Sequence, residues 1–256
     1  MTTDNPTVWL CIPSINLEYC ARYLPAWKQQ GYRVAVSTDE GMVQRMSPMI
    51  GGMIDLLVSP RGEYPGYWRS MNALTRFVMN RSTHLTYGHV SHSFQIDGID
   101  QIIADVCVVA GDDMEPDDRH SAQDIARHFL RIFPGGYGVM QPTGSGEDGV
   151  DRIAGSPWIG RAWIEEAYRG NGPYHDGYFH FYGDEELLNV ARAQAAFIQL
   201  SQYRQRHHQW CNPDGHNYAK RTHYQQRNSD NHWEADKALF FRRQREGFPG
   251  SERLPV

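Results

Sequence analysis

Two patterns of apolar and polar residues alternate along this chain. Short apolar runs that end in polar residues are typical of buried strands. Runs with apolar residues three or four positions apart are typical of amphipathic helices. Strands are predicted within residues 7–14, 32–41, 53–60, 104–111 and 136–144. Helices are predicted within 16–31, 67–80, 121–133, 184–200 and 235–248, and 157–170 combines a short strand with a helix.

Local signals refine several of these elements. Pro25 lies inside the helical pattern of 16–31, where it predicts a kink. Ser121 and Asp124 have the spacing of a capping box. Ile198 continues the apolar face of the helix expected over 184–200. The alternating run 203–210 predicts a further strand.

The strand–helix alternation indicates an α/β fold, Rossmann-like, with a mostly parallel sheet flanked by helices. Ligands of such sheets bind outside the carboxyl ends of the strands. Polar residues follow three of the predicted strands at that edge: Pro13 and Ser14, then Thr38 and Asp39, then Asp112 and Asp113. We therefore expect these side chains to meet at one edge of the sheet.

Adjacent carboxylates repel each other unless a cation lies between them. Mg²⁺ and Mn²⁺ prefer oxygen ligands and are commonly held by one or two carboxylates together with substrate phosphates. Asp112 and Asp113 therefore indicate a metal-bound nucleotide diphosphate. The chain contains neither GxxxxGK[ST] nor GxGxxG, which disfavours the P-loop and classical dinucleotide-binding classes. The alternative is a plain turn, with Asp117 or Asp118 beginning the next helix.

Composition and charge narrow the class of protein. The 256 residues suffice for one large domain or a domain with an extension, and the 12% aromatic content supplies a core. Residues 192–246 hold ten Lys/Arg against five Asp/Glu, whereas residues 1–191 hold fourteen against twenty-four. Such a basic C-terminal region can bind the phosphates of a nucleotide or of a nucleic acid, or it can be a solvated surface.

Targeting signals are not evident in the sequence. The first ten residues lack a basic start and a long apolar run, and the apolar runs elsewhere are too short to cross a bilayer. The four cysteines show no CxxC spacing, so we expect reduced thiols in a cytoplasmic protein.

The ordered segments CIPSIN, VSTDEG, MNAL and VVAGDDMEP, followed by GVMQPTG, GSPWIGRAWIEEAY and GDEELLNVA, resemble a GT-A glycosyltransferase of the family 2 type. The resemblance covers roughly residues 7–200. It implies a GT-A-like domain over 1–200 and a basic, His-rich C-terminal extension over 201–256 that packs on the same domain. The fuller DxDD motif is incomplete, because Ala110 and Gly111 precede the aspartates.

The resemblance also assigns roles to residues at the donor site. Asp113 would bind the metal, Mn²⁺ or Mg²⁺, and Asp112 would contact the metal or the ribose of the donor. The remaining donor-binding residues would be Pro13, Ser14 and Asp39 around the nucleoside and Asn72 near the donor.

The stretch YGDEELL offers a candidate general base. In the family, an acidic residue that begins this helix faces the acceptor hydroxyl, a role that requires a carboxylate ionised at neutral pH. Asp184 is the first candidate and Glu185 the second. The alternative is a plain helix cap, since acidic residues in a first turn are favoured by the helix dipole alone.

Histidines and arginines cluster near the C-terminus. Five of the twelve histidines fall between 207 and 232, and they match no standard zinc motif. Some GT-A enzymes add a C-terminal histidine to the metal, and His208 is the candidate chosen here over His207 and His216. A helix over 235–248 would bury Leu239 and Phe240; Arg242, Arg243 and Arg245 would face solvent or contact the leaving diphosphate.

Aromatic residues are spread over regions that would border an acceptor site. Sugars and nucleobases both pack on aromatic faces, although most aromatic residues simply belong to the core. Trp158 is the single acceptor-binding candidate, because it follows Gly155, Ser156 and Pro157 in an expected loop.

We expect a metal-dependent, hexosyltransferase-like enzyme that moves a sugar from a nucleoside diphosphate sugar to an acceptor hydroxyl. The acceptor would be a glycan or a hydroxymethylated base in phage-type DNA, which would require base extrusion. The alternatives are a metal-dependent hydrolase or nucleotidyltransferase that uses the same carboxylates, and a non-catalytic module that binds a nucleotide sugar or a nucleic acid.

Overall fold

The computed structural model describes residues 4–59, 64–79, 84–87, 90–93, 103–143, 154–208 and 223–254. The strands are β1 (Val8–Pro13), β2 (Arg33–Ser37), β3 (Leu56–Val58), β4 (His84–Tyr87), β5 (Val90–Ser93), β6 (Val106–Val109), β7 (Met114–Glu115), β8 (Val139–Thr143), β9 (Trp158–Gly160), β10 (Phe197–Arg204) and β11 (Arg206–His207). The helices are α1 (Leu17–Gln29), α2 (Glu40–Ile50), α3 (Tyr67–Met79), α4 (Ala122–Ile132), α5 (Arg161–Glu166), α6 (Gly183–Ala193) and α7 (His223–Arg245), with short 3₁₀ turns at Gly51–Met53 and Ala167–Gly170.

A seven-stranded sheet forms the centre of the fold, in the order β10-β8-β9-β6-β1-β2-β3. The pairs β1–β2, β2–β3, β1–β6 and β8–β10 are parallel. Only β9 runs against its neighbours β6 and β8. The mostly parallel α/β sheet expected from the sequence is therefore confirmed.

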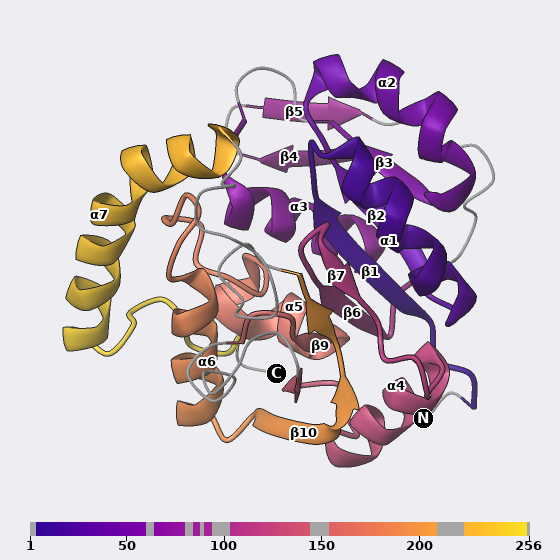
Figure 1. Cartoon of the computed structure of the whole chain (residues 1–256). Helices are drawn as coiled ribbons and strands as arrows, with labels where there is room; N and C mark the ends of the chain where they lie inside the picture. Colours follow the sequence, from indigo (N-terminus) through magenta and orange to yellow (C-terminus); the bar gives the residue numbers. More distant parts are fainter. Residues whose placement is uncertain are drawn as a thin grey trace.

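Helices cover both faces of this sheet (Figure 1). Val8, Leu10 and Ile12 of β1 belong to one buried cluster, together with apolar residues of α1 and α4. Trp9 and Cys11, which point to the opposite face, belong to a second cluster with apolar residues of α3, α5 and α6. Burial on both faces explains the nearly continuous apolar runs of the strands.

Helix ends follow local chemistry in α1 and α4. The side chain of Asn16 accepts a hydrogen bond from the backbone N–H of Tyr19 at the start of α1, which then runs on through Pro25 to Gln29. Ser121 caps α4 as predicted, since its hydroxyl oxygen accepts from the backbone N–H of Asp124 at 3.1 Å.

The helix expected over 184–200 is shorter than predicted. α6 ends at Ala193, Ala195 adopts a left-handed φ of 51°, and Ile198 lies in β10. β10 pairs in parallel with β8, so sheet formation outweighs the helical spacing of the apolar residues. Helix α2 and the hairpin of β4 and β5 were not predicted by the pattern of apolar residues.

The C-terminal region is part of the same fold. The boundary expected at residue 200 falls inside β10, and β11 pairs with β7 in a small antiparallel sheet. α7 lies along one side of the molecule, opposite α1 and α2 (Figure 1). Arg243 of α7 is buried rather than exposed, because its guanidinium donates two hydrogen bonds of 2.8 Å to Glu186.

Among the helices that the structure describes, none has both the length and the apolar content that a membrane span requires.

Candidate functional site

Two adjacent carboxylates stand just beyond the carboxyl end of β6. β1 runs parallel to β6, so Ser14 reaches this edge from the neighbouring strand, and its hydroxyl donates a short hydrogen bond to Asp112. The Ser14 oxygen in turn accepts from the backbone N–H of Asn16 at 2.9 Å and from the thiol of Cys20 at 3.4 Å. Ser14 thereby holds the Asp112 carboxyl in one orientation.

The second carboxylate, Asp113, is buried and contacts a histidine from the C-terminal region. Antiparallel pairing of β11 with β7 places His207 opposite Met114. Nε2 of His207 then lies 3.1 Å from Oδ1 of Asp113. The backbone N–H of His208 also donates to the carbonyl oxygen of Asp113 at 2.9 Å. The small sheet therefore joins a residue more than ninety positions away to the acidic pair.

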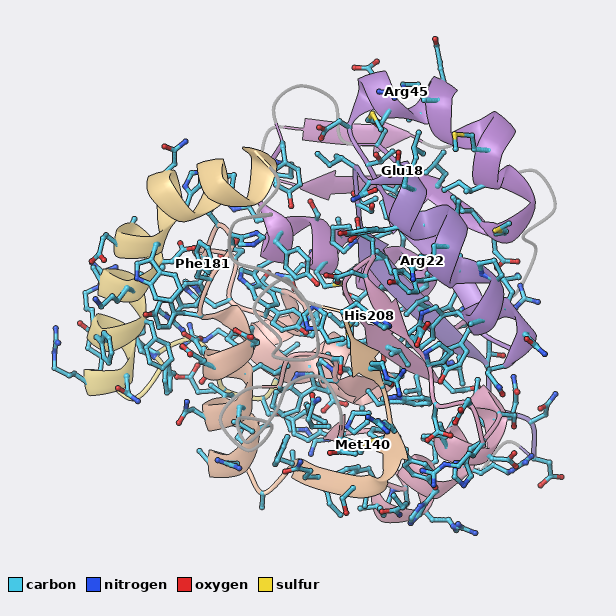
Figure 2. All side chains as sticks on the ribbon, in the orientation of Figure 1. Glu18, Arg22, Arg45, Met140, Phe181 and His208 are labelled. Atoms are coloured by element: carbon cyan, nitrogen blue, oxygen red, sulfur yellow. The ribbon has the colours of Figure 1, made fainter. Side chains whose placement is uncertain are left out.

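His208, the metal-binding histidine expected from the sequence, turns the other way. Its Nε2 lies 3.1 Å from Oε2 of Glu115, and its ring stacks on Tyr23 with ring centres 5.0 Å apart. The imidazole that lies against the acidic pair is that of His207, whereas His208 contacts Asp113 through its backbone N–H. Successive residues of a strand point to opposite sides, and the pairing register selects between them. Figure 2 shows His208 near the middle of the molecule.

The two aspartates have opposite electrostatic environments. Burial and the neighbouring Asp113 raise the pKa of Asp112 to about 7. Burial acts in the same direction on Asp113, but the hydrogen bond and charge of His207 outweigh it, and the pKa of Asp113 is lowered. Ionisation of Asp112 is therefore opposed first by burial and then by the adjacent carboxylate, both of which a nearby cation would offset.

Asp184 and Glu185 lie in the first turn of α6, as expected. Burial raises the pKa of Asp184, and His207 acts on it in the opposite direction. Burial and the charge of Asp184 raise the pKa of Glu185 to about 7. His207 therefore lies within electrostatic reach of Asp184 as well as of Asp112 and Asp113.

Tyr67, the first residue of α3, links the two groups of carboxylates. Burial raises its pKa, and the charges of Asp184, Asp112 and Asp113 raise it further. Its hydroxyl donates to the carbonyl oxygen of Ala110 at 3.4 Å. The paired aspartates and the start of α6 thus belong to one site, and a neutral phenol lies among them.

The segment that leads into Asp184 is held by buried groups of α7. The carboxylate of Asp236 accepts the backbone N–H groups of Phe179, His180 and Phe181 at 2.9, 2.8 and 2.8 Å. Asp236 is only 4% exposed. On the other side of Asp184, Glu186 pairs with the buried Arg243. α7 therefore anchors the chain both before and after the candidate base.

The residues expected around the nucleoside lie at the predicted edge. Pro13 pairs with Ser37 in the parallel register of β1 and β2. The N–H of Ser14 donates to the carbonyl oxygen of Ser37 at 2.8 Å, so the ends of the two strands lie side by side. Asp39 lies two residues after the end of β2, and burial raises its pKa. Their contact with a nucleotide remains a prediction.

Two sequence candidates have structural roles instead. Asn72 is fully buried: its amide nitrogen donates to the carbonyl oxygen of Tyr174 at 2.9 Å, and its amide oxygen accepts from the N–H of the same residue. Trp158 is fully buried in β9, and its indole N–H donates to the side chain of Gln205 at 2.5 Å. Neither presents a free polar group or an open face, so both expectations are corrected.

Two site residues were missed by sequence reasoning. Tyr67 was not singled out from the other aromatic residues, although it opens an amphipathic helix. Gly111 was noted only as a gap in the acidic motif. A Cβ at position 111 would lie 2.7 Å from Oδ1 of Asp113, so the absence of a side chain makes room for that carboxylate. A glycine directly before the acidic pair was the signal for this role.

The donor set suits a hard divalent cation. Asp112, Asp113 and His207 offer carboxylate oxygens and one imidazole nitrogen, ligands that Mn²⁺ accepts. Burial and the neighbouring Asp113 carboxylate both raise the pKa of Asp112, and a bound cation would act against both effects. Within the described residues no group of three His, Cys, Asp or Glu side chains is arranged to hold a metal ion. A cation here would therefore need further ligands, such as water or substrate phosphates.

No protein-family model matches this chain, and comparison with curated proteins finds no match either. Function must therefore follow from the residues themselves.

Proposed function

We propose that this protein is a metal-dependent glycosyltransferase that moves a sugar from a nucleoside diphosphate sugar to an acceptor hydroxyl. The observation that carries the proposal is the meeting of Asp112, Asp113, His207 and Asp184 at the carboxyl edge of a mostly parallel sheet. Such an edge is where α/β sheets bind their ligands. A parallel sheet interrupted by one antiparallel strand is also compatible with a GT-A fold.

Each residue would have a distinct part in the transfer. Asp113 and Asp112 would hold Mn²⁺ or Mg²⁺ together with substrate phosphates, with Ser14 orienting Asp112 and His207 adjoining Asp113. The bound cation would neutralise the charge that builds on the leaving diphosphate. Pro13, Ser14 and Asp39 would line the nucleoside, because they lie at the ends of β1 and β2, the next two strands of the sheet after β6.

Asp184 would orient the acceptor hydroxyl and accept its proton. Its pKa is raised by burial, which brings its basicity closer to that of a base working at neutral pH. Glu185 shares the first turn of α6, and the pKa of its carboxyl is raised to about 7. In a retaining enzyme Asp184 would position the acceptor without taking its proton.

A donor screen tests the proposal. Thermal shift with UDP, GDP and CDP plus Mn²⁺ selects the nucleotide, and sugar nucleotides of that base are then assayed for turnover with and without acceptors. We expect donor turnover that is abolished by EDTA and by Asp113→Ala. Asp118→Ala is the matched control, because Asp118 is an exposed carboxylate five residues further along the chain, beyond β7.

The products of the donor assay distinguish a transferase from a hydrolase and from a non-catalytic binding module. Sugar transfer to an acceptor supports the proposal, whereas release of free sugar or nucleotide under every acceptor condition indicates a hydrolase. Turnover that persists in EDTA would refute the metal role. Nucleotide binding without any turnover would indicate a binding module.

A further inference from the structure

Four aromatic side chains gather where α7 meets the segment that leads into α6. Trp233 packs edge-on against Phe181, with ring centres 4.8 Å apart, and lies 5.3 Å from the ring of Tyr182. The ring of Tyr182 also lies 6.3 Å from that of Phe241, two turns further along α7. We call Phe181, Tyr182, Trp233 and Phe241 the aromatic platform. Figure 2 shows Phe181 beside α7.

The platform is open to solvent. Trp233 is 40% exposed and Phe241 is 43% exposed, which places both among the most exposed large apolar side chains of the described residues. Phe181 and Tyr182 are half-buried. Large aromatic faces left in water on a folded protein often mark a site of recognition.

The backbone beneath the platform is held in place. Tyr182 adopts a left-handed conformation with φ of 64°, which is uncommon for a residue other than glycine. The carboxylate of Asp236 accepts hydrogen bonds from the backbone N–H groups of residues 179–181, which directly precede Tyr182. The N–H of Tyr67 also donates to the carbonyl oxygen of Phe179 at 2.6 Å. The aromatic faces are therefore presented on a preorganised segment, which reduces the entropy lost on binding.

The candidate base, Asp184, lies close to the platform in the sequence, and the carboxylate next to it, that of Glu185, acts on the platform residue Tyr182. Asp184 follows Tyr182 after one glycine. The pKa of Tyr182 is raised by burial and by the carboxylates of Glu185 and Glu234. Glu234 pairs with Lys237, whose Nζ lies 3.7 Å from Oε1 of Glu234, so the acidic side of the platform is the one toward Asp184 and Glu185 at the start of α6. A phosphate chain placed on that side would meet repulsion, whereas hydroxyl groups could donate hydrogen bonds to these two carboxylates.

We propose that the aromatic platform binds a neutral sugar ring of the acceptor, so that the acceptor is a glycan and not DNA. A pyranose presents an apolar C–H face that packs on an aromatic ring, and its hydroxyls face the carboxylates at the start of α6. This inference rests on the proposed function for its link to transfer. The binding of sugar to the platform can be measured without any donor.

Calorimetric titration with neutral oligosaccharides, in the absence of metal and sugar nucleotide, tests the inference. The panel contains linear glucose, mannose, galactose and N-acetylglucosamine oligomers, together with a DNA duplex that carries 5-hydroxymethylcytosine. We expect at least one oligosaccharide to bind, and Trp233→Ala to weaken that binding by about tenfold. Trp233→Tyr should restore most of the affinity, because a flat aromatic face is kept.

Met49→Ala is the matched control, since Met49 is an exposed apolar residue on α2, and it should bind like the wild type. The inference is overturned if no oligosaccharide binds at millimolar concentration, if Trp233→Ala binds like the control, or if the DNA duplex binds and the sugars do not. Sugar binding that depends on Trp233 in a protein without donor turnover would support the platform and remove the transferase proposal. The two failures are therefore distinguishable.

Discussion

Replacing Gly111 with alanine tests whether the position of the Asp113 carboxylate matters for metal binding, because the substitution adds a single carbon atom beside it. The added Cβ would lie 2.7 Å from Oδ1 of Asp113, closer than carbon and oxygen approach in folded proteins. Gly111 does not have a positive φ, so alanine imposes no backbone strain. The Asp113 carboxylate must therefore move, and the effect of the substitution falls on this side chain.

The size of the movement follows from three distances. An ordinary contact of about 3.4 Å requires Oδ1 to shift by about 0.7 Å. The new carbon would lie 3.8 Å from Nε2 of His207, which itself lies 3.1 Å from Oδ1, so the shift is nearly perpendicular to the Asp113–His207 contact. That contact lengthens only to about 3.3 Å and survives. A metal ligand, by contrast, tolerates displacements of about 0.2 Å.

We therefore expect Gly111→Ala to fold and to keep the histidine contact, but to weaken Mn²⁺ binding and donor turnover by about tenfold to a hundredfold. Mn²⁺ affinity is measured by electron paramagnetic resonance titration, and turnover with the nucleotide sugar found by screening. Gly135→Ala is the matched control, because a Cβ there meets nothing within 4 Å. Equal Mn²⁺ affinity and turnover in the two variants would refute a metal role for Asp113.

Three further predictions concern other parts of the site. His207→Ala should weaken Mn²⁺ binding more than His208→Ala, because of the two imidazoles it is that of His207 that lies against the Asp113 carboxylate; the reverse order in the same titration would contradict the geometry. Asp236→Asn should lower the free energy of unfolding by about 2 kcal/mol in urea, since a charged acceptor of three N–H groups is lost; unchanged stability would count against this anchor. Burial lowers the pKa of His180 from 6.5 to about 4, so the unfolded chain takes up this proton at a higher pH than the folded protein does. The free energy of unfolding should therefore fall as the pH drops from 6.5 to about 4. His180→Phe should remove up to about 3 kcal/mol of this fall, and an equal pH dependence of unfolding in the variant and the wild type would contradict the prediction.

The sequence predicted the sheet well because its strands are buried on both faces. The apolar run of β1 and the alternation of its two faces follow directly from helices on each side. The end of α6 could not be read in the same way. Ile198 has helical spacing from Leu187 and Ala191, yet residues 197–200 of β10 pair in parallel with residues 139–142 of β8. Long-range pairing of this kind leaves no signal in local periodicity.

The candidate site was predicted in part. Asp112, Asp113 and Asp184 could be placed at this edge from the sequence because each follows a strand or begins a helix, and local pattern is enough to locate such ends. Trp158 was misplaced because a short strand, β9, is inserted between β6 and β8 and buries it. The choice between His207 and His208 depends on the register of β11 against β7, which neighbouring residues do not encode.

The C-terminal region matters to the site in two separate ways. β11 brings His207 to the acidic pair, and α7 anchors the backbone around Asp184 through Asp236 and Arg243. Glu186 is fully buried, so loss of Arg243 would leave a buried carboxylate without its cation, a change that typically costs about 3–5 kcal/mol. The basic residues counted in this region therefore do not all form a surface for phosphates. Arg243 neutralises the buried Glu186, so it adds nothing to the surface. The net charge of the C-terminal region therefore overstates the basic surface that a nucleic acid would meet.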